Sequence, residues 1–159
     1  MAKVIDKRMT VEMDGEFVVF LIGMGVNKPW KLQKWVPMVM AMRRMLKELD
    51  VHPEAGCLGH SGLGAIIVQY WRSFEHLESY ARAKDRGHWP AWLAFNRRVS
   101  ATRGDVGIWH ETYLIKPGNY EAIYSGMPPF GLGKVGKLVP ATGARESAAA
   151  RLTAGVPSA

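Results

Sequence analysis

The first fifty residues show two different patterns of hydrophobic positions, one typical of a strand and one typical of a helix. The stretch FVVFLIGMGV within residues 16–26 is apolar at nearly every position, which is typical of a strand covered on both faces. Residues 9–13 also read as extended, and the DGE at 14–16 predicts a tight turn between the two segments. From Pro29 to about Asp50, apolar residues recur at intervals of three and four, which predicts a helix with one buried face.

The next sixty residues alternate between strand and helix patterns. The glycine-rich residues 52–64 predict a loop or the start of a bulged strand, and the apolar AIIVQYW at 65–71 predicts a strand. Ser73 is a suitable N-cap for the helix that follows, and Pro90 suits the first position of another helix. VGIWHETYLI at 106–115 is an apolar strand with ionisable groups in its middle.

This order of strand, helix, strand, two helices and strand predicts, with one further strand, an α+β domain of the ferredoxin-like kind. Helices cover one sheet face of such a domain, yet three strands here are apolar on both faces. A second copy packed sheet to sheet would cover the other face, so we expect a homodimer that forms a dimeric α+β barrel. We assign residues 1–127 to this domain. Residues 128–159, rich in Gly, Pro and Ala, form an extension that wraps the body or a partner and has a disordered end.

Composition narrows the classes of protein. A chain of 159 residues suits one domain, and the single Cys57 rules out an internal disulfide. The first residues lack the apolar core of a signal peptide, so we expect a cytoplasmic protein. Apolar runs are too short to cross a bilayer, and we expect no membrane partner. The net charge of +7 is dispersed along the chain and comes with no nucleic-acid-binding motif, so we expect no nucleic-acid partner. The positive charge favours solubility and the attraction of an anionic substrate.

The strand at 106–115 carries the first candidate chemistry. Alternation divides it into one face with Trp109, Glu111 and Tyr113 and another with Ile108, His110, Thr112 and Leu114. His110 and Glu111 are therefore neighbours in sequence and not partners. If the face of His110 lines a pocket, its imidazole is suited to act as a general base near neutral pH. The alternative is a buried histidine bonded to a neighbouring group.

Two further ionisable groups carry expectations of their own. A buried Glu111 needs a cation, and we expect an ion pair with Arg72, Arg97 or Arg98. His88 stands just before a helix start, where the positive helix end favours a neutral ring able to accept a proton or to bind iron. The alternative for His88 is helix capping or contact with solvent.

The sequence predicts neither a metal centre nor a nucleotide-binding loop. It contains no paired cysteines, no His-x-His or His-x-x-x-His pattern, and no GxGxxG turn before a helix, so we assign no metal and no cofactor. Six tryptophans, five tyrosines, five phenylalanines and nine methionines are suited to line a roomy apolar cavity. Such a cavity would take a hydrophobic small molecule, although the same residues also serve plain core packing.

Three stretches carry a family resemblance: QYWRSFEHLESYARAKDRGHWPAWLAFNRRV at 69–99, GDVGIWHETYLIKPGNYEAIYSGMPPFGLG at 104–133 and GKLVPATG at 136–143. They resemble a bacterial and fungal family of monooxygenase-like proteins, formerly a domain of unknown function, that is similar to the fumagillin-pathway polyketide monooxygenase of secondary metabolism. The resemblance, over residues 17–143, implies a dimeric α+β barrel with a pocket between sheet and helices. Such barrels include haem-binding aldoxime dehydratases and chlorite dismutases and also proteins without established catalysis, so fold alone does not decide the activity.

Three hypotheses about function follow. The first is a monooxygenase-like oxidoreductase without a bound cofactor, in which His110 or His88 deprotonates an aromatic or polyketide-like substrate that then reduces dioxygen. The residues expected to contact that substrate are Tyr70, Trp71, Arg72, Asn96, Trp109, Glu111 and Tyr113. The second is a haem enzyme of the same fold, with His88 or His110 as the iron ligand. The third is a ligand-binding protein without catalysis.

Overall fold

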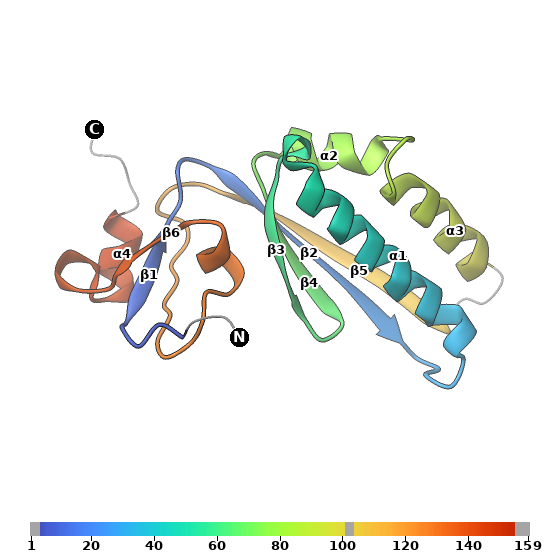
Figure 1. Ribbon diagram of the computed structural model, residues 1–159, viewed down its shortest axis with the longest axis horizontal. Coiled ribbons are helices and arrows are strands. Elements are labelled where there is room, and N and C mark those ends of the chain that lie inside the picture. Colours follow the sequence, from blue (N-terminus) through green and yellow to red (C-terminus); the bar gives the residue numbers. More distant parts are fainter. Residues whose placement is uncertain (1–3, 101–103, 155–159) are drawn as a thin grey trace.

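The computed structural model describes residues 4–100 and 104–154, which form a larger and a smaller part side by side (Figure 1). The strands are β1 (Met9–Glu12), β2 (Phe17–Val26), β3 (Cys57–Leu63), β4 (Ile66–Trp71), β5 (Val106–Ile115) and β6 (Lys137–Pro140). The helices are α1 (Leu32–Val51), α2 (Phe74–Arg82), α3 (His88–Ser100) and α4 (Ala148–Ala154). The chain is thus an α+β protein, as its hydrophobic pattern predicts.

The larger part is an antiparallel sheet with the strand order β3-β4-β2-β5. With α1 between β2 and β3, and α2 and α3 between β4 and β5, this is the ferredoxin-like arrangement. The further strand that this fold requires is β3, within the glycine-rich residues 52–64. It forms a hairpin with β4 through Gly64, whose φ of +61° favours glycine, and it has an irregularity between Cys57 and Gly59.

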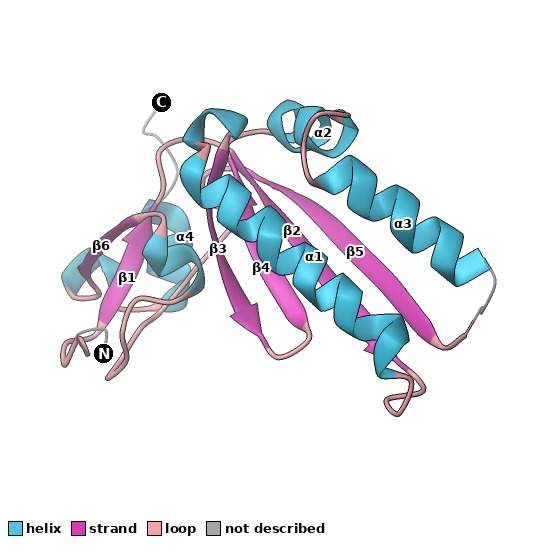
Figure 2. Ribbon diagram, turned by 45° about the vertical axis from the view of Figure 1, so that its right-hand side comes forward, coloured by secondary structure: helices cyan, strands magenta, loops and turns pink. Residues whose placement is uncertain are grey.

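Helices α1, α2 and α3 all lie over one face of the sheet (Figure 2). On this side Val18 of β2 and Trp71 of β4 pack with Leu49 of α1 and with Leu77 and Tyr80 of α2. Ser73 caps α2 as predicted, because its side chain accepts the His76 N–H at 3.4 Å.

Prolines lie inside two of the helices. Helix α1 begins at Leu32 and runs through Pro37. Helix α3 begins at His88, which places Pro90 at its third residue and makes the helix two residues longer than the proline alone suggests. His88 consequently belongs to the first turn of α3.

The smaller part joins the two ends of the chain. Strand β1 pairs with β6 and not with β2, although the turn at 14–16 separates β1 from β2 as predicted. Arg151 of α4 contacts Glu121, in the segment after β5, and its guanidinium donates to the carbonyls of Arg145 and Glu146 at 3.0 and 2.8 Å. Arg145 in turn donates to Glu12 of β1 at 2.7 Å, which connects this end of the chain to the strand pair. The disorder predicted for the end of the extension concerns residues 155–159, which lie outside the described residues.

The opposite face of the sheet is covered at one end by the chain itself. Phe17 of β2 and Tyr70 of β4 pack there against Val11, Tyr124 and Leu132. At this end of the sheet, where β2 begins, β1, Tyr124 and the start of the C-terminal extension occupy the face that a second copy is expected to cover. The dimer itself stays a prediction. Farther along, the same face stays open: Ile66, Trp109 and Tyr113 are each more than a third exposed.

Candidate functional site

Strand β5 has the two faces that its sequence predicts. His110 pairs with Ile22, and Leu114 pairs with Val18, whose side chain belongs to the core under α1 and α2. Paired residues of an antiparallel sheet share a face, so His110 stands on the helix side. Trp109 and Glu111 stand on the opposite side.

His110 is exposed on the helix side and rests on an aromatic ring. Its imidazole lies against Phe20, with ring centroids 5.4 Å apart and an angle of 34° between the planes. From Gly107 to Leu114 every residue of β5 is exposed, and α3 packs chiefly against α1 and α2. The helices therefore leave His110 accessible from their own side, where a substrate is free to approach it.

The opposite face of β5 holds three predicted substrate contacts. Trp109 lies across Gly23 of β2, and Tyr113 donates its hydroxyl proton to Glu111 Oε2 at 2.6 Å. This hydrogen bond and the negative charge of Glu111 raise the pKa of Tyr113. In the single chain Glu111 is exposed, because none of the described residues covers this end of the sheet. The side chain of Arg98, one of its expected partners, lies outside the described residues.

The other predicted substrate contacts are not brought together with His110. Trp71 is completely buried in the helix-side core, where its indole N–H donates to Gln69 Oε1 at 3.0 Å. Tyr70, the preceding residue of the strand, faces the opposite side and packs against the extension. Arg72 and Asn96 are both exposed.

His88 is held at the start of α3 by a backbone hydrogen bond. Its Nδ1 lies 2.8 Å from the carbonyl oxygen of Ala81, and its ring contacts Tyr80 at a centroid distance of 6.2 Å. A carbonyl oxygen only accepts, so Nδ1 carries the proton and the lone pair of a neutral ring is on Nε2. Nε2 is the atom suited to accept a proton or to bind a metal ion.

Tyr80 supports this turn through its hydroxyl group. It donates to Glu48 Oε2 at 3.2 Å, and the same carboxylate oxygen accepts the backbone N–H of Gly87 at 3.0 Å. Burial, followed by the charge of Glu48 and this hydrogen bond, raises the pKa of Tyr80, so the phenol stays protonated as a donor.

Sequence reasoning missed a cluster of hydroxyl groups around the short helix η2 (Gly131–Lys134). Ser61 Oγ accepts the N–H of Gly131 at 3.1 Å, and Tyr124 Oη accepts the N–H of Gly133 at 2.8 Å. Tyr70 lies beside them, and burial raises the pKa of both tyrosines. The motif MPPFGLG is part of a stretch that carries the family resemblance, but Ser61, which accepts from it, is 70 residues away in sequence.

Two hollows open at other places on the described surface. One, of about 310 Å³, lies between α1 and α3. The other, of about 330 Å³, lies on the opposite sheet face between Val19, Tyr70, Ile115 and the segment 120–132. Neither is lined by His110, so the pocket expected between sheet and helices stays a prediction.

In residues 4–100 and 104–154, no three side chains of the types His, Cys, Asp and Glu converge on a point suited to a metal ion. No helix of this part combines the length and apolar character needed to cross a membrane.

The strand order, the helix-covered face and the open β5 define a ferredoxin-like α+β protein with an accessible histidine on the helix side. The chain belongs to the Monooxygenase af470-like family, whose model matches residues 17–132. This confirms the resemblance drawn from the motifs at 69–99 and 104–133.

Two known proteins are similar to this chain in sequence or in structure. Monooxygenase af470 of Aspergillus fumigatus is 27% identical over 132 residues, which are 76% of this chain and 46% of the relative. The crystal structure of an aldoxime dehydratase matches with a TM-score of 0.65 at 16% identity, over 87% of this chain and 45% of that one. That match shows a shared fold. The chain spans about half the length of both proteins.

Proposed function

We propose that this protein is a monooxygenase-like oxidoreductase that acts on a hydrophobic aromatic or polyketide-like substrate at the helix side of β5. The observation that carries the proposal is the position of His110: exposed, on the helix side, and seated on Phe20. An imidazole next to an aromatic ring is suited to take a proton from a substrate that stacks beside it. Membership of a family named for a monooxygenase supports the same chemistry.

In the proposed reaction, His110 removes the acidic proton of a phenol or enol, and the resulting anion transfers electrons to dioxygen. For a phenol with hydrogen on the ring carbon opposite the hydroxyl, the product is a quinone. One oxygen atom of O₂ enters the ring at that carbon. The other leaves as water with the two hydrogens that the substrate loses, so no external reductant is consumed. His88 Nε2 is a second proton acceptor from the first turn of α3.

An oxygen electrode tests this proposal. With a panel of phenolic and polyketide substrates, we expect oxygen uptake that falls at least a hundredfold in His110→Ala, the usual range for loss of a general base. His60→Ala is the matched control, because His60 bonds to the exposed Asp50 and should leave the rate unchanged. Circular dichroism checks that both variants fold. No oxygen uptake with any substrate, together with tight binding of some, would favour a ligand-binding protein without catalysis.

A haem-binding function is the second candidate, and the orientation of His88 favours it. Because Nδ1 donates its proton to the Ala81 carbonyl, Nε2 carries the lone pair that binds iron. A hydrogen bond from the other ring nitrogen to a backbone carbonyl is usual for a histidine that binds a metal ion. Bound haem would supply peroxide activation or dehydration chemistry at its iron. Titration with hemin tests the fit: a Soret band that shifts in wild type and His110→Ala, but not in His88→Ala, supports His88 as the ligand. Identical spectra for all three would reject it.

We also propose that two copies associate through the open end of the opposite sheet face, where Ile66, Trp109 and Tyr113 are exposed. This chain spans about half the length of both relatives, so a second copy would supply the missing mass. Analytical ultracentrifugation should give a dimer for wild type and a monomer for Tyr113→Glu, which puts a second negative charge beside Glu111 in the interface. Phe74→Lys, on exposed α2, should stay dimeric.

A further inference from the structure

A groove lies between α1 and the start of α3 in the helical layer. Its volume is about 310 Å³, and its walls are Pro37, Met38, Ala41, Arg44 and Met45 from α1, with Gly87, Pro90, Ala91 and Ala94 from the start of α3. Alanines at three of these positions keep the helices from filling the space between them. Methionine walls adapt to ligands of irregular shape because the side chain is unbranched and polarisable.

Arg44 is the charged residue in this wall. It is exposed, and it forms no ion pair with any residue of the described parts of the chain. The surrounding sequence is basic: residues 27–47 contain Lys28, Lys31, Lys34, Arg43, Arg44 and Lys47 and no aspartate or glutamate. Lys28 and Lys31 are paired with Asp105, which leaves the basic charge concentrated along α1. The groove therefore has a positive potential at one rim.

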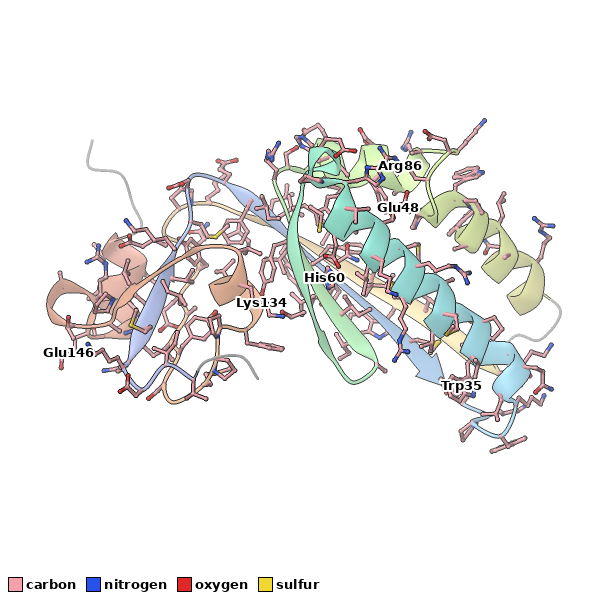
Figure 3. All side chains as sticks on the ribbon, in the orientation of Figure 1. Trp35, Glu48, His60, Arg86, Lys134 and Glu146 are labelled. Carbon is pink, nitrogen blue, oxygen red and sulfur yellow. The ribbon has the colours of Figure 1, made fainter. Side chains whose placement is uncertain are left out.

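Glu48 is the nearest carboxylate on α1, and its charge is already engaged. It accepts the Tyr80 hydroxyl and the Gly87 N–H, and its other oxygen lies 3.9 Å from Arg86 Nη1. Figure 3 labels Glu48 and Arg86 close together at the end of α1. Glu48 thus closes the end of the groove at Gly87 without presenting a free negative charge to a ligand.

We propose that this groove binds an amphiphilic anion, with an apolar chain between the two helices and its carboxylate at Arg44. An uncharged apolar molecule would leave the unpaired guanidinium unused. A small anion would gain little from the methionine, proline and alanine walls. An alkyl chain that ends in a carboxylate uses both the apolar walls and the arginine. Its apolar part is removed from water, and its charge pairs with the guanidinium of Arg44. This site uses neither His110 nor His88 and does not depend on the function proposed above.

Calorimetry and methionine methyl NMR test the proposal on the full chain. The probes are decanoate below its micelle concentration, decanol, and decyltrimethylammonium. We expect decanoate to bind up to about fivefold more tightly than decanol, which is the upper end of what one exposed charge pair contributes. The cation should bind more weakly than both. Decanoate should shift the methyl signals of Met38 and Met45 and leave that of Met127, which packs in the other core, in place.

Two variants localise the site. Arg44→Gln should bring decanoate to the affinity of decanol, and Ala91→Trp should abolish binding of both by filling the groove. Arg43→Gln, on the same exposed stretch of α1 but outside the wall, should change decanoate affinity by less than twofold. Ala41→Trp fills the groove from the other helix, in case Ala91→Trp does not fold.

The result that overturns the proposal is equal affinity for decanoate and decanol in wild type, or decanoate binding that survives every groove-filling variant that folds. Methyl shifts confined to Met127 would place the ligand elsewhere and also reject it. Failure of decanoate to bind at all rejects the groove as an amphiphile site. Oxygen uptake is also measured on Arg44→Gln and Ala91→Trp. Neither substitution replaces His110, so loss of decanoate binding with unchanged oxygen uptake shows that the groove and the proposed monooxygenase site are separate.

Discussion

Trp109 of β5 lies directly across Gly23 of β2, on the sheet face that the helices do not cover. A methyl group placed on Gly23 would come within 2.5 Å of the indole nitrogen. The two residues are partners in the β2–β5 ladder, so the large ring occupies the space that the glycine leaves empty. Gly23 is buried as a result, although much of the surrounding face is open. Trp109 itself is 38% exposed.

Gly23→Ala should displace this ring and destabilise the protein by about 1 kcal/mol or more, the usual lower range for inserting a methyl group into a filled space. Gly25→Ala is the matched control. It lies two residues along the same face with nothing within 4 Å of the added methyl, so it should be neutral or slightly stabilising. Urea unfolding followed by tryptophan fluorescence measures both. Equal stabilities for the two variants would contradict the contact.

The alternation that separates His110 from Glu111 was readable from the sequence, because a strand has a period of two whatever surrounds it. The same rule applies to Tyr70 and Trp71, which the sequence analysis grouped as substrate contacts although neighbours in a strand must face opposite sides. The structure puts one in each core. Applied consistently, the rule would have placed Tyr70 on the face of Tyr113 and Trp71 on the face of His110. It would not have shown that Trp71 is completely buried, because burial depends on the helices that pack over it.

Other features depend on contacts between distant residues, which local pattern does not encode. Helix α1 and the Ser73 cap follow from spacing and side-chain chemistry within a few residues. The pairing of β1 with β6 joins segments more than 120 residues apart in the chain, and β1 alone reads as a neighbour of β2. Strand β3 was hard to recognise because its glycines weaken the strand pattern.

Tyr124→Phe should cost about 1 kcal/mol, because it removes the oxygen that accepts the buried N–H of Gly133. The carbonyl of Phe130, 3.0 Å from the same N–H, keeps the loss from being larger. Tyr113→Phe is the control, since the exposed Tyr113 bonds only to exposed Glu111 and should change stability by less than about 0.5 kcal/mol. A larger loss in Tyr113→Phe than in Tyr124→Phe would refute this account of the hydroxyl cluster.

Asp105 should make stability depend on pH. Its side chain is 4% exposed and lies 2.7 Å from both Lys28 Nζ and Lys31 Nζ, and hydrogen bonds to these lysines hold its pKa below the ordinary value. A depressed carboxyl pKa contributes stability that is fully present above the unfolded-state pKa and is lost as pH falls through the folded-state pKa. Wild type should therefore exceed Asp105→Asn in unfolding free energy at pH 7. The difference should shrink progressively below about pH 4. A constant difference down to pH 2 would contradict the ion pairs.

Arg151 should be the main attachment of α4. Its side chain is 6% exposed and contacts Glu121 as well as two backbone carbonyls. Arg151→Met leaves these acceptors without a donor and should cost about 2–3 kcal/mol. Arg82→Met breaks an exposed pair with Glu78 and should cost less than about 0.5 kcal/mol. Thermal unfolding measures the loss of stability, and amide exchange should show faster exchange in residues 148–154 of Arg151→Met alone.

The protonated nitrogen of His88 can be read directly, with His60 as an internal reference. His88 Nδ1 faces the Ala81 carbonyl, whereas His60 Nε2 faces Asp50 Oδ1 at 3.0 Å, so the neutral rings should carry their protons on opposite nitrogens. Long-range ¹H–¹⁵N spectra at mildly alkaline pH distinguish the two forms. His88 should carry its proton on Nδ1 and His60 on Nε2. A proton on Nε2 of His88 would remove the lone pair that both the proton-transfer and the haem hypotheses assign to that atom.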